Sequence, residues 1–273
     1  MKFGRCFFCC HSNKKAREYS FSKASEAGPR NLKGVEKLLS YKFKDKTLLE
    51  KAFTHASCTD VKSESYERLE YFGDAVLNLL VTRAFYLWYP NFSPGLLTQL
   101  RAANVDTEKL ARVAIKHELY TYLRHRKGNQ IEDQIQDFKQ QMKIHPLHSK
   151  GLIKTPKVLA NIVESLIGAI FLDSGFSLDM TWQMVKFLLE PIIFPETMRP
   201  HPKSELQELC QKKGWKLQYK GDMENGVISV FVDDRLVGKA SFSSPSISKD
   251  VATNQAANDA LIHLKTSTFP GLD

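Results

Sequence analysis

The sequence has few cysteines and no long apolar run, and each absence excludes a class of protein. Its five cysteines stand at positions 6, 9, 10, 58 and 210 without the spacing of a disulfide framework, which favours a reducing compartment, nuclear or cytoplasmic. No stretch approaches the length of about 18 apolar residues that a membrane span needs. The apolar run near the N-terminus is too short for a signal peptide, and residues 1–31 lack the Arg-rich amphipathic pattern of a transit peptide.

The N-terminal segment is basic and predicted to be poorly ordered. Residues 1–31 are rich in Lys, Ser, Ala and Gly and end near Gly28-Pro29. Its run Cys6-x-x-Cys9-Cys10-His11 could bind zinc, but no second ligand pair follows at zinc-site spacing. Of the net charge of +9, residues 1–51 supply +8, with 13 Lys and Arg against 5 Asp and Glu. Such an arm suits a polyanion partner or a nuclear import signal, or it is only a soluble tail.

Residues 32–195 predict an all-α domain. Apolar residues recur at helical spacing from Leu32 onwards, and no alternating run of strand length is found before Pro191. An acidic helix is expected from residue 67 to about residue 89, where Pro90 ends it. Residues 124–157 are polar and predict a loop with at most one short helix. A strongly apolar helix over 157–172 should lie at the centre of the domain.

The composition changes after Pro195, where Pro200 and Pro202 indicate a linker over 196–202. A helix over 204–213, strands over 216–219, 226–232 and 235–242, and a helix over 248–264 are then expected. This α-β-β-β-α order predicts a small α+β module over 203–266, followed by a short tail over 267–273.

The acidic helix contains the most informative spacing in the chain. Glu67, Glu70 and Asp74 stand at i, i+3 and i+7, so a helix places the three carboxylates on one face beside an apolar stripe. Like charges one turn apart repel each other by roughly 0.2–0.5 kcal/mol per pair. A cation would neutralise them, so the spacing fits either a metal site or a solvated acidic face.

Longer motifs resemble the ribonuclease III family. The run Glu67–Leu77 looks like the signature of its nuclease domain, and the C-terminal segment, with Leu206-Gln207-Glu208 in its first helix and Ala256-Ala257 in its last, is similar to a double-stranded-RNA-binding domain. The further segments that resemble the nuclease domain are Tyr41-Lys42-Phe43, Thr54-His55-Ala56-Ser57, Leu97-Thr98-x-Leu100-Arg101 and residues 157–168. One nuclease domain followed by one such module is the arrangement of the short plant ribonuclease-III-like proteins and of the bacterial enzymes.

The resemblance implies a Mg²⁺-dependent endoribonuclease, with Mn²⁺ as a substitute, that cuts double-stranded RNA as a homodimer. In the family, two metal ions activate a water and stabilise the leaving oxygen of a phosphodiester. The family's catalytic positions fall on Asp74 and Glu164. Its metal ligands fall on Glu70, Asp74, Asn161 and Glu164, its rim acid on Glu67, and its dimer-interface aromatic on Phe72. His55 resembles a structural hydrogen-bonding residue rather than a base.

Asn161 departs from the family, which has Asp at this position. An amide oxygen can still ligate Mg²⁺, but it carries no charge, and one unit charge at ~4 Å is worth about 4 kcal/mol at an effective dielectric near 20. The alternatives are therefore an active nuclease, a catalytically weakened or inactive RNA-binding or assembly protein, and a dimer partner of an active relative.

The C-terminal module also departs from its family. Its last helix begins with Lys249-Asp250 where the family has a lysine-rich run, and the loop Gly221–Gly226 is acidic. Since affinity for a duplex rises with each phosphate neutralised, weak RNA binding is expected. The remaining candidate RNA contacts are Gln207, Glu208 and Lys249, together with Glu67 at the rim of the nuclease site. The alternative role of the module is dimerisation or protein contact.

Overall fold

The structure is a computed structural model that describes residues 32–59, 64–126, 128, 130–242 and 247–266. The expected basic arm with its cysteine motif and the expected tail after residue 266 lie outside the described residues. No helix in these described ranges is long and apolar enough to cross a membrane.

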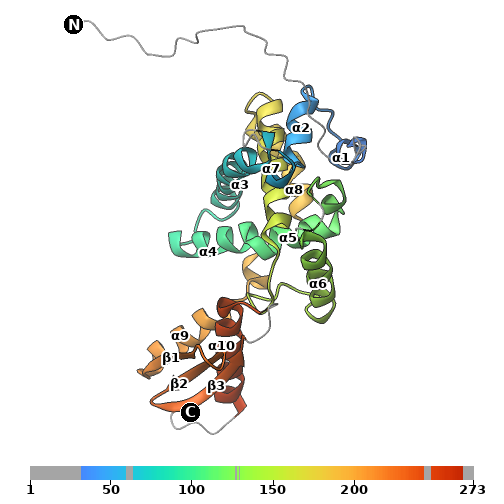
Figure 1. The fold of residues 1–273 in the computed structure, drawn as a ribbon. Helices are drawn as coiled ribbons and strands as arrows, with labels where there is room; N and C mark the ends of the chain where they lie inside the picture. Colours follow the sequence, from blue (N-terminus) through green and yellow to red (C-terminus); the bar gives the residue numbers. More distant parts are fainter. Residues whose placement is uncertain (1–31, 60–63, 127, 129, 243–246, 267–273) are drawn as a thin grey trace, which may run out of the picture.

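The larger part of the molecule is helical (Figure 1). Its α-helices are α1 (Lys33–Leu39), α2 (Lys46–Ala52), α3 (Glu67–Trp88), α4 (Pro94–Val105), α5 (Thr107–Lys116), α6 (Ile131–Ile144), α7 (Lys157–Asp173) and α8 (Leu178–Leu189). Short 3₁₀ turns lie at Ala56–Cys58 (η1), Leu119–Tyr122 (η3) and Pro195–Thr197 (η4). The expected all-α class is confirmed for this part, whose only extended pairing among the described residues is an isolated bridge between Thr54 and Arg124.

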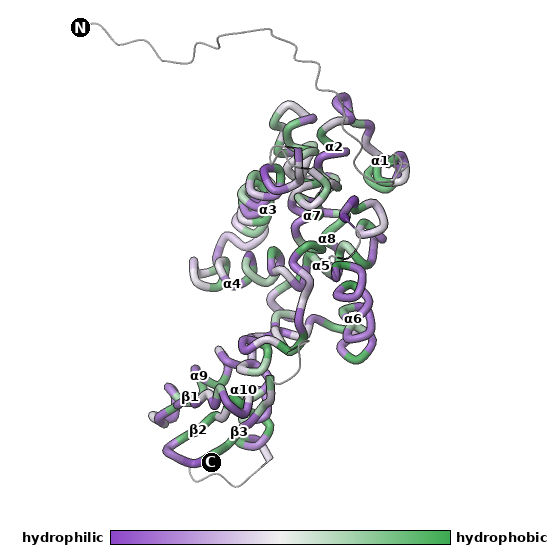
Figure 2. Tube along the Cα trace, viewed as in Figure 1, coloured by the Kyte–Doolittle hydropathy of each residue, from purple (hydrophilic) through white to green (hydrophobic). Residues whose placement is uncertain are grey.

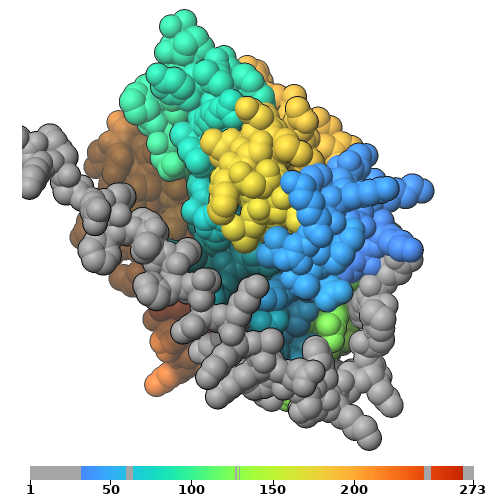
Figure 3. Space-filling model, turned by 90° about the horizontal axis from the view of Figure 1, so that it is seen from above, coloured from blue at the N-terminus to red at the C-terminus, as the bar shows by residue number. Residues whose placement is uncertain are grey.

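Helix α7 lies at the centre of this part, as its apolar sequence predicts. Most of its residues are buried, and it packs chiefly against α3 and also against α5, α2 and α8. Figure 3 shows the last part of α7 (yellow) beside the α1–α2 segment (blue). There the carboxylate of Asp173 accepts hydrogen bonds from the Tyr41 hydroxyl at 2.6 Å and from the Lys44 and Asp45 backbone amides.

The polar stretch between residues 124 and 157 differs from its prediction. Instead of a loop with at most a short helix, it contains the 14-residue helix α6. Buried Ile131, Ile135 and Phe138 stand at i, i+4 and i+7, so a narrow apolar stripe holds an otherwise Gln-rich helix against the core. Figure 2 shows this alternation of hydrophobic and hydrophilic residues along α6.

A second, separate hydrophobic core belongs to the C-terminal elements. They are α9 (Pro202–Lys213), β1 (Leu217–Asp222), β2 (Val227–Val232), β3 (Arg235–Ser241) and α10 (Lys249–Thr266). The strands form an antiparallel sheet in the order β1-β2-β3, and α9 and α10 pack against one another. Alternate residues of β2 are buried, which is the pattern of a sheet with one covered face. The expected α-β-β-β-α order is confirmed, whereas the expected boundaries 32–195, 196–202 and 203–266 stay predictions.

Candidate active site at the crossing of two helices

Helix α3 presents the three acids of the signature along one side. Leu69, Val76 and Leu77 are buried and hold the helix against α7, which leaves the acids on the adjacent face. Glu67 and Glu70 lie in the first turn, where the positive end of the helix dipole favours negative charge. The structure thus gives these residues the shared face that their spacing predicts.

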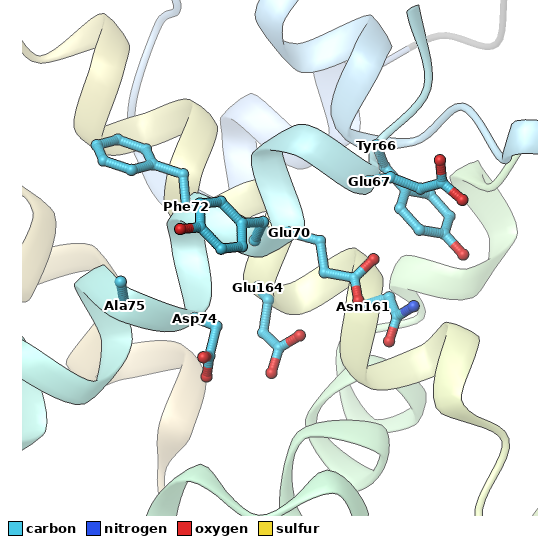
Figure 4. Close-up of a pocket in the computed structure, with 9 residues that line it drawn as sticks. Tyr66, Glu67, Glu70, Phe72, Asp74, Ala75, Asn161 and Glu164 are labelled. Carbon is cyan, nitrogen blue, oxygen red and sulfur yellow. The ribbon is translucent and has the colours of Figure 1, made fainter. Parts of the chain in front are cut away.

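Helix α7 brings Asn161 and Glu164 to the same place. The two helices cross so closely that a Cβ at Gly73 would lie 1.8 Å from the backbone oxygen of Glu164. One helical turn separates Asn161 from Glu164, so both face the acids of α3 across the crossing (Figure 4). A pocket of about 730 Å³ lies there, lined by Tyr66, Glu67, Glu70, Tyr71, Phe72, Asp74, Ala75, Asn161 and Glu164.

The pocket concentrates negative charge. Burial, followed by the charges of Asp74 and Glu70, raises the pKa of Glu164 to about 7. Burial and the charges of Glu67 and Asp74 also raise the pKa of Glu70. Among the described residues, no Lys or Arg forms an ion pair with any of these acids. The Oδ1 atom of Asp74 accepts a hydrogen bond of 2.9 Å from the Asn78 amide, and the Oε2 atom of Glu67 accepts one of 3.4 Å from the Ser65 hydroxyl. No described Lys or Arg therefore balances the charge of these acids through an ion pair.

The donor set of this pocket fits a hard divalent cation. Carboxylate and amide oxygens are the ligands that Mg²⁺ prefers, and Mg²⁺ keeps several waters, so it needs few protein ligands. No three His, Cys, Asp or Glu side chains converge at ligand spacing within the described ranges. Like charges with no cation between them are expected to stay apart, so the acids line a common pocket rather than a closed cage.

Tyr66 is a pocket residue that sequence reasoning did not select. The residue is 5% exposed, and burial raises the pKa of its hydroxyl to about 12, although the side chain of Asn161 acts in the opposite direction. Tyr66 stands at i−4 from Glu70 and i−8 from Asp74. The same four-residue spacing that joins Glu70 to Asp74, continued one turn towards the N-terminus, leads to Tyr66 and could have identified it from the sequence.

Two further residues of the sequence motifs have clear surroundings. The Nδ1 atom of His55 accepts a hydrogen bond of 3.0 Å from the Ser57 backbone amide, in agreement with the predicted structural role. Phe72 is half-buried, and its ring centroid lies 5.7 Å from that of Phe171, which in turn contacts Phe176. Phe72 thus belongs to an aromatic cluster beside the acids.

Helices α9 and α10, which carry the candidate RNA contacts of the C-terminal part, lie apart from α3 (Figure 1). Gln207 and Glu208 are exposed on α9, and Lys249 is exposed at the first residue of α10. The acidic turn between β1 and β2 is held by the Asp222 carboxylate, which accepts hydrogen bonds from the Glu224 and Asn225 backbone amides. The structure brings Glu67 to the acidic pocket and the other three residues to the small module.

Comparison with known proteins follows the same division of the chain. Residues 67–175 match the family described as "Ribonuclease III domain", and residues 202–264 match "Double-stranded RNA binding motif". The chain is 46% identical over 242 residues to Ribonuclease 3-like protein 3 of Oryza sativa subsp. japonica, covering 87% of this chain and 80% of the relative. It is 44% identical over 240 residues to Endoribonuclease Dicer homolog 1 of Arabidopsis thaliana, covering 85% of this chain but only 12% of that protein.

Among solved structures, the nuclease domain of ribonuclease III from Campylobacter jejuni is 31% identical, with a TM-score of 0.45 over 60% of this chain and 99% of that one. The identity to the rice relative over most of both chains, together with the two matched domains, shows that this chain belongs to the ribonuclease III family.

Proposed function

We propose that this protein is a divalent-metal-dependent endoribonuclease that cleaves double-stranded RNA. Its membership of the ribonuclease III family and its double-stranded-RNA-binding motif support this activity. The single observation that carries the proposal is the pocket at the α3–α7 crossing, which is lined by four carboxylates and one amide and in which no described Lys or Arg forms an ion pair with these acids.

The side chains of the pocket have separable tasks in this proposal. Glu70, Asp74, Asn161 and Glu164 would hold Mg²⁺, or Mn²⁺ as a substitute. When bound, the metal supplies an activated water and stabilises the leaving oxygen of the phosphodiester. Asp74 is exposed and faces the incoming RNA, whereas Glu164 lies deeper, where its charge is costly without a cation. Glu67 stands at the rim as a candidate RNA contact.

A homodimer is part of the same proposal. The side chain of Tyr71 is 83% exposed and that of Phe176 is 62% exposed, beside the half-buried rings of Phe72 and Phe171. Exposed apolar surface of this kind is typical of protein interaction sites. It adjoins the acidic pocket, so a partner bound here would place a second pocket near the first. Sedimentation of the purified chain measures this association directly.

Asn161 supports a second candidate function, a weakened or inactive nuclease that acts as an RNA-binding or assembly protein. Its amide contributes a ligand oxygen but no charge, which lowers the attraction for a cation. The nuclear or cytoplasmic location expected from the cysteines stays a prediction.

Incubation of the purified protein with a long RNA duplex and Mg²⁺ or Mn²⁺ tests the proposal. The wild-type chain should cut, and Glu164→Gln should abolish cutting because it removes the charge of a half-buried ligand. Glu118→Gln makes the same chemical change at an exposed position outside the pocket and should leave cutting unchanged. Cleavage by Asn161→Asp alone would favour the weakened site, and no cleavage by any of these proteins would exclude nuclease activity.

A further inference from the structure

A second cavity lies beside the first two helices of the described chain. It has a volume of about 1110 Å³, and its lining comes from α1, from α2 and from the turn between them. These elements lie at the surface of the helical part (Figure 3, blue). The cavity shares no lining residue with the acidic pocket. It is therefore a separate candidate binding site.

The floor of this cavity is apolar. Leu49 is 1% exposed and Tyr41 is 8% exposed, and half-buried Leu32 completes the apolar lining. The Tyr41 hydroxyl already donates a hydrogen bond of 2.6 Å to the carboxylate of Asp173. What Tyr41 offers to a ligand is therefore its ring rather than its polar end. An apolar side chain placed against this floor would be stabilised by leaving water.

The rim of the cavity carries an excess of positive charge. Glu36 is already compensated, because it forms an ion pair with Lys46 and accepts a hydrogen bond of 2.8 Å from the Phe43 backbone amide. Among the described residues, Lys37 and Lys42 form no ion pair. The charged lining residues are the exposed lysines Lys33, Lys37, Lys42 and Lys46 and the two glutamates Glu36 and Glu50.

Two occupants that carry charge match this cavity poorly. Duplex RNA presents phosphates and sugars on its outside and keeps its bases paired inside, so it has no apolar group to place against the floor. The basic arm, residues 1–31, holds 7 Lys and Arg against 2 Asp and Glu, so it has the same sign of charge as the rim. An acidic peptide that contains a large apolar residue matches both the floor and the rim.

We propose that the cavity between α1 and α2 is a docking site for an acidic peptide segment of a partner protein. A large apolar side chain of the segment packs against Tyr41 and Leu49, and its carboxylates pair with Lys37 and Lys42. The ammonium groups of these lysines end long flexible stems and can reach carboxylates on either side of the apolar residue. The site is independent of the proposed nuclease activity, because the two cavities have no residue in common.

Fluorescence anisotropy with the full chain tests this docking site. The probe is a fluorescein-labelled peptide in which one leucine has two glutamates on each side. Replacing its leucine by glycine should weaken binding about tenfold or more, because the apolar contact is lost. Replacing its glutamates by glutamines should weaken binding as well, because the pairing with the rim is lost.

On the protein side, the test combines Lys37→Gln and Lys42→Gln in one chain. This variant should bind the leucine peptide about five- to tenfold more weakly, because two exposed ion pairs are lost. The matched control combines Lys143→Gln and Lys212→Gln, which remove the same charge from exposed positions outside the cavity. The control should bind like the wild-type chain. Thermal unfolding of both variants checks that the fold is unchanged.

Three outcomes would overturn the inference. The leucine peptide could fail to bind, or the Lys37→Gln, Lys42→Gln variant could bind it like the wild-type chain, which would place the peptide elsewhere, such as on the basic arm. Equal affinity for the glycine peptide would show a basic surface without a role for the apolar floor. Loss of RNA-duplex binding in the same variant, with no binding of the peptide, would assign the lysines to nucleic acid instead.

Discussion

At the scale of single residues, the site is defined by charge that the protein does not neutralise. Glu164 is half-buried among Glu70 and Asp74, and these surroundings raise its pKa to about 7 from an ordinary value of 4.5. Half-buried carboxylates that repel one another are unfavourable, and they usually occur where a bound ligand or a catalytic role requires them. With Asn161 instead of an aspartate, the pocket carries one negative charge fewer. The repulsion between the acids is therefore weaker, and so is their attraction for a cation.

The raised pKa of Glu164 predicts how the metal-free protein responds to pH. Between about pH 4.5 and pH 7 the folded chain binds more protons at this site than the unfolded chain, so the free energy of unfolding falls as the pH rises through this window. The loss should be at most about 3 kcal/mol, and smaller because the half-buried group is partly screened by solvent. Urea denaturation across this pH range in the presence of a chelator measures it.

Glu164→Gln is the control for this titration, because it removes the ionisable group and keeps the shape of the side chain. The variant should lose most of the decline between pH 4.5 and pH 7 and retain the part that belongs to Glu70, whose pKa is raised as well. If wild type and variant had the same pH profile, the pKa of Glu164 would not be raised in the folded chain.

At the scale of elements, the site exists because two helices approach each other closely. The contact is made by Gly73 of α3 and Gly168 of α7, where a Cβ on the latter would lie 2.4 Å from the backbone oxygen of Leu69. These obstacles are backbone atoms, which cannot rotate away as side chains can. The small residues therefore set the separation of the helices, and through it the distance between the acids of α3 and those of α7.

Substituting Gly73→Ala should push the two helices apart. The added methyl group meets the Glu164 carbonyl at 1.8 Å, and overpacking of this kind typically costs about 1–3 kcal/mol, occasionally more. We expect a loss of stability at or above the upper end of this range in thermal or urea unfolding, together with weaker Mn²⁺ binding by the part that still folds.

Gly95→Ala provides the comparison for that substitution, because Gly95 also lies in a helix but has only the Ser93 hydroxyl oxygen, at 4.0 Å, near its would-be Cβ. Alanine is the better helix former by roughly 0.5–1 kcal/mol, so this variant should be as stable as the wild-type chain or slightly more so. A Gly73→Ala protein of undiminished stability would show that the helices can separate at little cost.

At the scale of the whole molecule, a small polar contact joins the two parts of the chain. The Gln255 side chain on α10 donates a hydrogen bond of 2.9 Å to the Leu152 carbonyl, and a ring nitrogen of His201 lies 3.0 Å from the Lys150 carbonyl. Asn254 packs directly over Gly151. The contact thus lies near the N-terminal half of α10, a few residues from Lys249.

Gly151→Ala should open this contact. A Cβ at this position would lie 2.7 Å from the Asn254 amide nitrogen, so the Asn254 side chain must turn away and its packing over Gly151 is lost. Small-angle X-ray scattering should then show a larger radius of gyration for the variant than for the wild-type chain.

Gly175→Ala separates this effect from backbone strain. Gly175 has a similar positive φ, +73° against +81° for Gly151, but nothing lies within 4 Å of its would-be Cβ. Gly175→Ala should lose about as much stability as Gly151→Ala, because both place an alanine at positive φ, but it should not change the radius of gyration. If both variants scattered like the wild-type chain, the contact would not determine the arrangement of the two parts.

The sequence alone determined the features that depend on local spacing. The helical period placed Glu67, Glu70 and Asp74 on one face, the apolar run of α7 put that helix at the centre, and the patterns after Pro195 indicated the α-β-β-β-α order of the small module. The polar stretch before α7 was misjudged because only three residues of α6 are fully buried apolar ones, with Met142 partly buried beside them, in a helix that also contains four glutamines.

Only the tertiary structure decided which distant residues meet. Tyr66 and Asn161 are 95 positions apart in the chain, and no local pattern states that both line the same pocket. The raised pKa of Glu164 has the same origin, because it depends on burial and on charges carried by α3. Both follow from the close crossing of α3 and α7, since packing between elements, rather than helical periodicity, fixes which side chains share a low-dielectric pocket.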